Sequence, residues 1–310
     1  MNTNVQCNPQ EDAAALRKAM KGLGTDEDKI IKICANRNYQ QRKAIFDSYR
    51  SQFDRDLVKD IKDELRGKLE DTIVALFTEP AENDAINLKK AMKGAGTDED
   101  TLMEILASRP TWYIKRIKEI YRIKFNKDLI DDIKSDLSGD LKQIMMSICN
   151  CEREDDPQVV DQNKCKRLSE ELYNAGENKA GTNEDKFYEI LTKTSGAEIY
   201  CINQFYTQSY GHDLVHAIDN EFSGKCKRLL SNIVYAIVNP PEFFAKRLKA
   251  SMKGIGTKDQ MLIRLLVSRM DIDLPQIKVA YKNLFKKELV DDIKSETSGD
   301  YKKMLVDMVS

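Results

Sequence analysis

The sequence predicts an all-α protein built from four repeats of about five helices each. Three observations support this. A short glycine motif, G-x-G-T or a close variant, occurs four times, with its second glycine at Gly24, Gly96, Gly181 and Gly256. The intervals between these glycines, 72, 85 and 75 residues, recur in the series Tyr49, Tyr121, Tyr206 and Tyr281. Apolar residues inside each unit recur at helical spacing, with no sustained strand alternation, as expected of a helical repeat protein.

Composition agrees with this class. Of 310 residues, 41% are hydrophobic and 33% charged, which suits a soluble helical protein and argues against collagen or disorder. Lys and Arg (50) nearly balance Asp and Glu (51), so we expect no nucleic-acid partner. The first residues are polar and no run of 18 apolar residues occurs, so we expect a cytoplasmic protein without a signal peptide, spanning helix or lipid anchor. The seven cysteines are irregularly spaced, as in a protein with reduced thiols.

Proline and charge at the junctions set the expected boundaries. We expect a short N-terminal head (1–8), repeat 1 (9–79), repeat 2 (80–151), a linker (152–162), repeat 3 (163–238) and repeat 4 (239–310). The connection from Asn150 to Gln162 is the longest and most polar, and its acidic run from Glu152 to Asp156 is typical of a solvated linker. We therefore expect two pairs of repeats with a freer joint at this connection.

The glycine motif is expected to form a loop that leads into a helix. Thr25, Thr97 and Thr182 each precede an Asp by three residues, which resembles a capping box and predicts that these threonines are helix N-caps. An acidic residue follows each second glycine at a constant distance of 40 residues: Glu64, Asp136, Glu221 and Glu296.

This pairing of a glycine loop with a distant acid favours a calcium site. Glycine tolerates the positive φ values with which a loop turns its carbonyl groups inward. If Met20, Gly22 and Gly24 each offer a carbonyl oxygen and Glu64 both carboxylate oxygens, a cation gains about five ligands, whereas calcium takes six to eight. The remaining positions could be filled by lipid phosphate oxygens, so the ion would connect the protein to an acidic membrane. The alternative is a helical solenoid in which the glycines only make turns and the acids cap helices. It does not explain why acid and loop always occur together.

With these motifs in hand, the sequence resembles the annexin family, whose hallmark is K-G-x-G-T followed about 40 residues later by an acid, in four repeats. The resemblance covers nearly the whole chain. It implies a slightly curved disc of four five-helix domains that binds calcium (Ca2+) and phosphatidylserine-type acidic phospholipid membranes. The calcium ligands that it implies are Met20, Gly22, Gly24 and Glu64; Met92, Gly94, Gly96 and Asp136; Gly176, Lys179, Gly181 and Glu221; and Met252, Gly254, Gly256 and Glu296.

Two further groups of residues carry hypotheses. Leu23 and Ile255 at the loop tips are expected to enter the lipid interface, and Lys21, Lys93 and Lys253 to approach headgroup phosphates. The resemblance implies a polar central cluster of Glu104, Arg109 and Arg264, either lining a channel or acting as a structural salt-bridge cluster between the two halves. The third repeat departs from the others at Thr194, where they have Arg37, Arg109 and Arg269.

Other classes of function find less support. The chain has no phosphate-binding loop and no hydrolase or zinc-protease motif, so we expect no enzyme. His212 and His216 are four residues apart, but no third metal ligand is evident. The alternative to lipid binding is a calcium-regulated scaffold for cytoskeletal proteins on the same fold. We expect a monomer in solution that binds membranes peripherally when calcium rises, with lateral assembly there as a further prediction.

Overall fold

The computed structural model describes residues 7–22, 24–94, 96–254 and 256–310. Within these residues it contains 20 α-helices and no strand. The all-α fold of four repeats with five helices each is therefore confirmed. None of the described helices is long and apolar enough to cross a membrane.

The repeats share one helix pattern, in which the fourth helix always has eight residues. The helices of repeats 1 and 2 are α1 (Pro9–Ala19), α2 (Glu27–Ala35), α3 (Tyr39–Phe53), α4 (Leu57–Glu64), α5 (Gly67–Phe77), α6 (Pro80–Ala91), α7 (Glu99–Ser108), α8 (Thr111–Phe125), α9 (Leu129–Asp136) and α10 (Gly139–Asn150). Those of repeats 3 and 4 are α11 (Gln162–Ala175), α12 (Glu184–Lys193), α13 (Gly196–Tyr210), α14 (Leu214–Glu221), α15 (Gly224–Val238), α16 (Pro240–Ser251), α17 (Asp259–Arg269), α18 (Leu274–Phe285), α19 (Leu289–Glu296) and α20 (Gly299–Val309).

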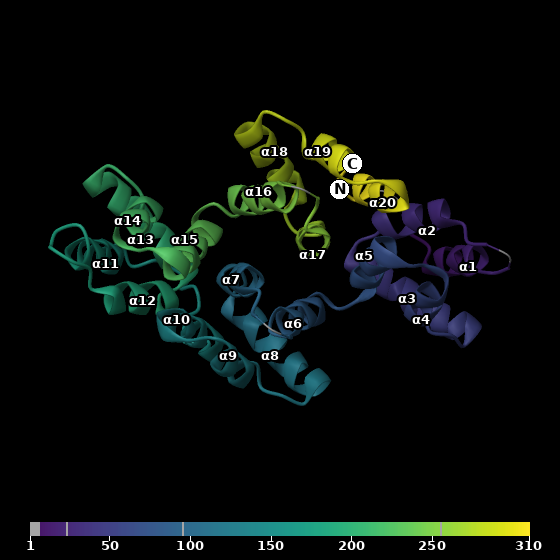
Figure 1. The fold of residues 1–310 in the computed structure, drawn as a ribbon, viewed down its shortest axis with the longest axis horizontal. Coiled ribbons are helices and arrows are strands. Elements are labelled where there is room, and N and C mark those ends of the chain that lie inside the picture. Colours follow the sequence, from purple (N-terminus) through teal and green to yellow (C-terminus); the bar gives the residue numbers. More distant parts are fainter. Residues whose placement is uncertain (1–6, 23, 95, 255) are drawn as a thin grey trace. The chain divides into compact units, whose positions relative to one another are not determined.

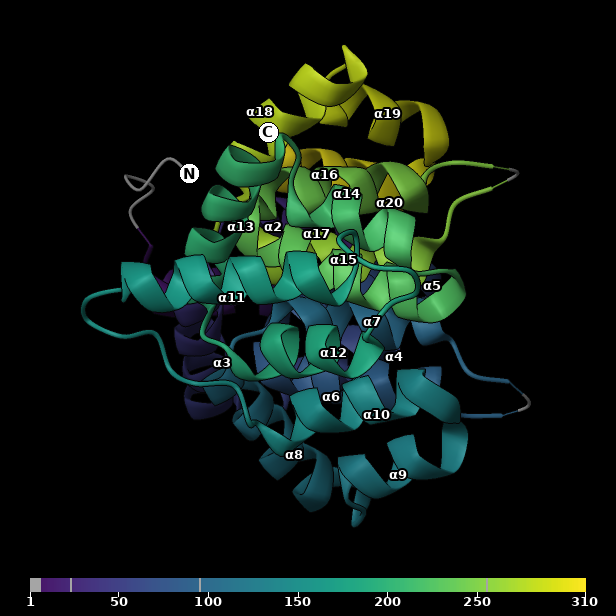
Figure 2. The ribbon, with the colours of Figure 1, turned by 90° about the vertical axis from the view of Figure 1, so that its left-hand side faces the viewer.

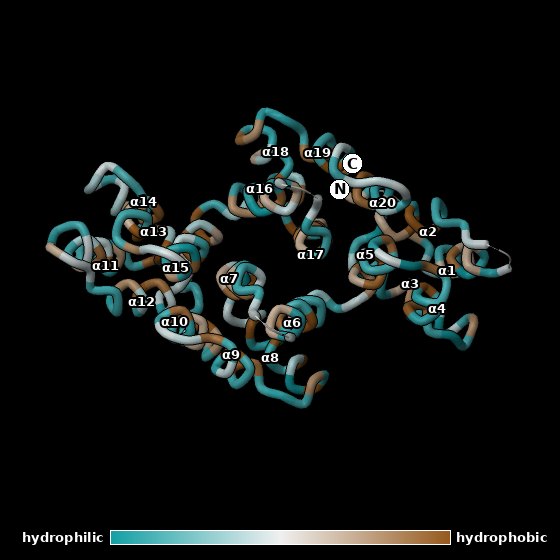
Figure 3. Tube along the Cα trace, in the orientation of Figure 1, coloured by the Kyte–Doolittle hydropathy of each residue, from teal (hydrophilic) through white to brown (hydrophobic). Residues whose placement is uncertain are grey.

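Most helices are amphipathic, and hydrophobic and hydrophilic residues alternate along them at helical spacing (Figure 3). Each repeat buries the tyrosine of its third helix completely: Tyr49, Tyr121, Tyr206 and Tyr281. The third helix ends at a residue in the left-handed region in every repeat: Asp54, Asn126, Gly211 and Lys286. This conformation stops the helix and redirects the chain into the fourth helix.

The chain divides into two compact units. Unit 1 comprises the described residues up to Asn83 and those from Phe244 to Ser310, so it combines repeats 1 and 4. Within it α2 packs on α20, and α5 packs against α17 and α20 (Figure 1). Ion pairs join the two repeats: Lys68 Nζ lies 2.6 Å from Asp259 Oδ2, Lys303 Nζ lies 2.8 Å from Asp28 Oδ1, and the guanidinium of Arg42 lies 2.9 Å from Asp271 Oδ2.

Unit 2, from Asp84 to Phe243, combines repeats 2 and 3 in a similar way. Helix α7 packs against α15, and α10 contacts both α12 and α15 (Figure 2). Ion pairs again join the repeats. Lys225 Nζ lies 2.8 Å from Glu99 Oε1, and the guanidinium of Arg228 lies 2.5 Å from Asp100 Oδ1.

The predicted pairing of repeats was therefore wrong. The connection between Asn150 and Gln162 does not separate two pairs but lies inside unit 2. Although its acidic side chains are exposed, its backbone is fixed to repeat 3, because Glu154 N donates to Lys193 O at 2.7 Å. The guanidinium of Arg153 donates to the carbonyls of Leu191 (2.7 Å) and Thr194 (3.1 Å). A half-buried arginine within the acidic run thus docks the connection, and the polar composition of the segment concealed this.

Candidate functional site

Each candidate loop follows the first helix of its repeat and returns the chain to the end of that helix. The residue after the motif threonine donates its N–H to the carbonyl of the last residue of the helix that precedes the loop. In repeat 1 this bond joins Asp26 N to Ala19 O at 2.9 Å, and the equivalent bonds in the other repeats measure between 2.7 and 2.8 Å. Within the loop of repeat 1, Gly22 and Gly24 have φ values of 117° and 89°. Residues with a Cβ rarely adopt this conformation, so the two glycines are what allow the turn.

The predicted N-caps were displaced by one residue. The helices after the loops are capped by Asp26, Asp98 and Asn183, not by the threonines before them. Asp26 Oδ1 accepts from Lys29 N at 3.0 Å, and Asp98 Oδ1 accepts from Thr101 N at 3.0 Å. A short side chain with an oxygen acceptor serves well as an N-cap, and the residue after each threonine provides one.

The threonine hydroxyls have a different partner, namely the acid that lies 40 residues beyond the second glycine of the motif. Thr25 Oγ1 donates to Glu64 Oε2 at 2.8 Å, and Thr182 Oγ1 donates to Glu221 Oε2 at 2.5 Å. The bond from Thr97 Oγ1 to Asp136 Oδ2 is longer, 3.3 Å, in keeping with the shorter side chain. In repeat 4 the hydroxyl of Thr257 binds the backbone carbonyl of Glu296 instead, at 2.9 Å. The structure thus brings each acid to its loop, a contact that the constant spacing indicated without identifying the threonine.

The acids reach the loops because each is the last residue of the eight-residue fourth helix. In repeat 3 the approach is especially close. A Cβ added to Gly176 would lie 3.0 Å from Glu221 Cγ and 3.1 Å from its Cδ. Gly176 therefore leaves room for the carboxylate beside the loop backbone, which a larger residue would fill.

Comparison with known proteins identifies the family that has this architecture. A family model described as Annexin matches residues 11–76, 83–148, 169–233 and 243–308. The chain belongs to the annexin family. Annexin A11 of Oryctolagus cuniculus is 43% identical over 298 residues, which cover 96% of this chain and 59% of that protein, so the chain spans less than two thirds of that relative. The family is known for calcium-dependent phospholipid binding, and its members are in general binding proteins rather than enzymes.

Solved annexin structures have the same fold. The structure of annexin III is 40% identical and has a TM-score of 0.92, with 98% of this chain and 94% of that chain covered. A calcium-bound structure of annexin (Sm)1 is 29% identical and has a TM-score of 0.90, with 98% and 90% covered.

The residues of this annexin chain fit a calcium ion. Carboxylate and carbonyl oxygens are the hard ligands that calcium prefers. Among the described residues, no donor is hydrogen bonded to the carbonyl oxygens of Met20, Gly22 or Gly24, nor to those of their equivalents in repeats 2 and 4. In repeat 3 the carbonyl of Gly176 accepts a bond from Lys179 N at 3.1 Å. Among the described residues, the carbonyl sets of repeats 1, 2 and 4 thus have no donor, and that of repeat 3 is partly engaged.

The residues proposed to contact lipid are only partly described. Lys21, Lys93 and Lys253 are exposed on their loops. Leu23 and Ile255 lie outside the described residues.

Arg109, predicted to join a central polar cluster, forms an ion pair inside its own repeat. Its guanidinium binds both carboxylate oxygens of Asp84, at 2.7 and 3.2 Å, and the two side chains are only 7% and 2% exposed. Glu104 is buried in unit 2 and Arg264 in unit 1. That these residues form one cluster stays a prediction.

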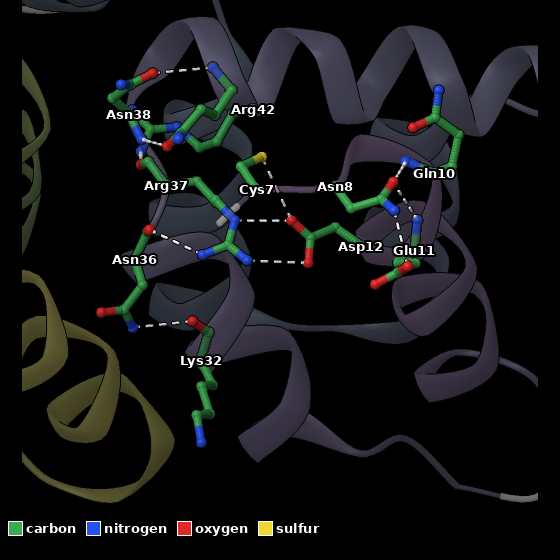
Figure 4. A network of polar contacts seen from close by, with 11 residues as sticks. Cys7, Asn8, Gln10, Glu11, Asp12, Lys32, Asn36, Arg37, Asn38 and Arg42 are labelled. Carbon is green, nitrogen blue, oxygen red and sulfur yellow. Dashed lines mark hydrogen bonds and ion pairs between the residues drawn. The ribbon is translucent and has the colours of Figure 1, made fainter. Parts of the chain in front are cut away.

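Repeat 1 contains the counterpart of the Arg109 pair. Arg37 binds both oxygens of Asp12, at 2.7 and 3.1 Å (Figure 4). In repeat 4 the guanidinium of Arg269 lies 4.2 Å from the ring centroid of Phe244 and pairs with Asp273. Repeat 3 has Thr194 at this position, and there Arg153 of the connecting segment supplies a guanidinium to the Thr194 carbonyl. In repeat 3 a guanidinium near this position thus comes from a residue outside the repeat.

Proposed function

We propose that this annexin binds acidic phospholipid membranes, including phosphatidylserine membranes, through calcium ions held at its glycine loops. The observation that carries the proposal is that the carboxylates of Glu64, Asp136 and Glu221 are hydrogen bonded to threonines at the glycine loops, 39 residues away in sequence. A bound calcium ion would supply positive charge and open coordination positions for lipid phosphate oxygens. The near balance of acidic and basic residues makes such an ion necessary for strong attraction to an anionic surface.

Each proposed site has one acidic ligand, which comes from the end of the fourth helix, so the affinity for calcium alone is expected to be weak. An anionic membrane that completes the coordination raises this affinity, and by linkage calcium raises the affinity for the membrane by the same factor. Four loops acting together would add avidity. We accordingly propose a protein that is cytoplasmic at low calcium and peripheral on membranes when calcium rises.

Cosedimentation with vesicles of phosphatidylserine and phosphatidylcholine, in calcium or in chelator, tests the proposal. The wild-type chain should pellet only with calcium. A variant with Glu64→Gln, Asp136→Asn, Glu221→Gln and Glu296→Gln should remain in the supernatant. A control that neutralises four exposed acids outside the loops, Asp47, Asp131, Glu189 and Asp291, should pellet like the wild type. Calcium-dependent pelleting of the loop variant would overturn the proposal, and calcium-dependent pelleting with purified filaments but not with vesicles would favour the cytoskeletal alternative.

The exposed loop lysines are proposed to add contacts with headgroup phosphates. Changing Lys21, Lys93 and Lys253 to Gln should therefore raise the calcium concentration needed for half-maximal pelleting, by about 1 kcal/mol of membrane attraction per lysine at most. Unchanged pelleting across the calcium titration would remove the lysines from the mechanism.

A further inference from the structure

Three repeats fix their buried tyrosine with an aspartate on the fourth helix. Tyr49 donates to Asp60 Oδ2 at 2.7 Å and Tyr121 to Asp132 Oδ2 at 2.5 Å. Tyr281 donates to Asp292 in the same way. A basic side chain completes each group, as when the guanidinium of Arg55 binds both oxygens of Asp60 at 2.6 Å. In these repeats the whole group lies on helices and at the turn between them, and the calcium loop takes no part in it.

Repeat 3 lacks that aspartate and has the buried Ala217 in its place. Tyr206 instead donates to Glu177 Oε2 at 2.6 Å. His212, at the position of Arg55 in repeat 1, has its Nε2 3.0 Å from each oxygen of Glu177. The acid has therefore moved from the fourth helix to the loop, where Glu177 directly follows Gly176.

This exchange ties the loop to the body of the repeat. Tyr206 is completely buried, and Tyr173 and Tyr210 surround its ring, with centroids at 6.4 and 4.8 Å. Burial and the bonded Glu177 carboxylate raise the pKa of Tyr206, so its hydroxyl remains a donor. The loop backbone beside Glu177 is also ordered, because Asn178 N donates to Tyr173 O at 3.0 Å. The tethered residue lies between Gly176 and Lys179, two of the carbonyls expected to hold calcium.

We propose that Tyr206 and His212 are positioning residues, which hold the loop of repeat 3 in its calcium-binding conformation through Glu177. The proposal rests on the proposed function, and it applies to repeat 3 alone. The tyrosines of the other three repeats bind helix residues, so they have no such effect on their loops. Ordering the loop before the ion binds reduces the entropy that binding must overcome.

The first experiment tests the tether without calcium. Hydrogen exchange is measured in chelator for the wild type, Tyr206→Phe and the matched control Tyr121→Phe. Tyr206→Phe should speed exchange at the amides of Asn178 and Lys179 severalfold, whereas Tyr121→Phe should leave them unchanged. His212→Ala, which removes the second anchor at a partly exposed site, should act in the same direction. Unchanged exchange in both Tyr206→Phe and His212→Ala, or equal acceleration in Tyr121→Phe, would overturn the proposal.

The second experiment measures calcium binding at repeat 3 alone, by calorimetry in a background with Glu64→Gln, Asp136→Asn and Glu296→Gln. Adding Tyr206→Phe should weaken calcium binding about tenfold or more, as expected for the loss of a hydrogen bond to a charged group. Adding Tyr121→Phe should not change it. Equal calcium affinity with and without Tyr206→Phe would overturn the positioning role.

A further variant separates this proposal from the proposed function. Glu221→Gln in the same background should abolish the remaining calcium binding. If calcium still binds with undiminished affinity, the assignment of the site is wrong, whereas the tether is still judged by the exchange of the calcium-free protein.

Discussion

At the scale of single residues, the hydroxyl of the motif threonine positions the distant carboxylate, a role that the sequence pattern could not indicate. It holds the carboxylate of Glu64 beside the loop in repeat 1, and its counterparts do the same in repeats 2 and 3. In repeat 4, Thr257 contacts only the backbone of Glu296. The carboxylate that calcium would need is therefore positioned in three loops and is not held by the threonine in the fourth.

Replacing the hydroxyl by a methyl group separates these two cases. Thr25→Val should weaken calcium binding at the repeat 1 loop a few fold, because it removes a hydrogen bond of roughly 1 kcal/mol that orients the carboxylate. Thr257→Val should have a smaller effect on the loop of repeat 4. Calcium titrations of chains with one functional loop measure both, and equal losses at the two loops would contradict this role of the threonine.

Asp292 predicts a pH dependence of stability. Burial disfavours its ionised form, but hydrogen bonds from Lys249, Lys287 and Tyr281 outweigh burial and lower its pKa to about 2. An unfolded aspartate has a pKa of about 4. Because the pKa is lower in the folded protein, the stabilisation is complete above about pH 4 and is lost as the pH falls toward 2.

The Asp292→Asn variant tests this pH dependence. Denaturant unfolding of wild type and variant should differ most above pH 4, and the difference should shrink as the pH falls toward 2. A difference that stays constant over this range would show that the charge of Asp292 does not contribute.

At the scale of elements, the helices begin where a short acceptor side chain can satisfy their first N–H groups. Asp26 at the start of α2 makes this bond, whereas Ser138 at the start of α10 makes no side-chain capping bond. The two residues occupy the same cap position with different consequences, since only a bonded cap stabilises its helix.

This difference predicts unequal effects of alanine. Asp26→Ala should lower the free energy of unfolding by about 1 kcal/mol, within the usual range for a lost N-cap. Ser138→Ala should have an effect near zero. Urea unfolding followed by circular dichroism measures both, and equal losses would show that the bond from Lys29 N to Asp26 is not stabilising.

Helical spacing and repeated motifs predicted the elements well, because both are local properties of the chain. The displacement of the N-cap from Thr25 to Asp26 has another cause: the threonine was already bound to Glu64, a residue far away in sequence. Glu177 was missed as the acid partner of Tyr206 for the same kind of reason. The repeat register contains a signal for it, since Ala217 stands where the other repeats have Asp60, Asp132 and Asp292.

At the scale of the whole molecule, the order of repeats along the chain did not reveal which repeats pack together. A long polar connection usually separates compact parts, yet here Arg153 fixes it to repeat 3. Burial lowers the pKa of Arg153 to about 10, which still leaves the guanidinium charged at neutral pH. Its two bonds to carbonyls help to keep the connection in place, together with the backbone bond from Glu154 N to Lys193 O.

Arg153→Ala should release this connection. Cleavage by a glutamate-specific protease at Glu152 and Glu154 should accelerate severalfold. In the wild type the hydrogen bond from Glu154 N to Lys193 O holds this backbone against repeat 3, and local opening would expose it to the protease. The control Lys164→Ala removes a half-buried side chain that pairs with both Glu154 and Glu198, and it should change the rate less. Equal cleavage rates in wild type and Arg153→Ala would show that the arginine does not dock the segment.

The ion pairs between repeats also disfavour one incorrect pairing of repeats. In unit 1 the lysine comes from repeat 1, as Lys68, and in unit 2 the equivalent lysine comes from repeat 3, as Lys225. Repeats 2 and 4 have Asp140 and Asp300 at this position. A misfolded chain that joined repeat 2 to repeat 4 would oppose acid to acid at both of these places, so charge repulsion would discourage that incorrect association during folding.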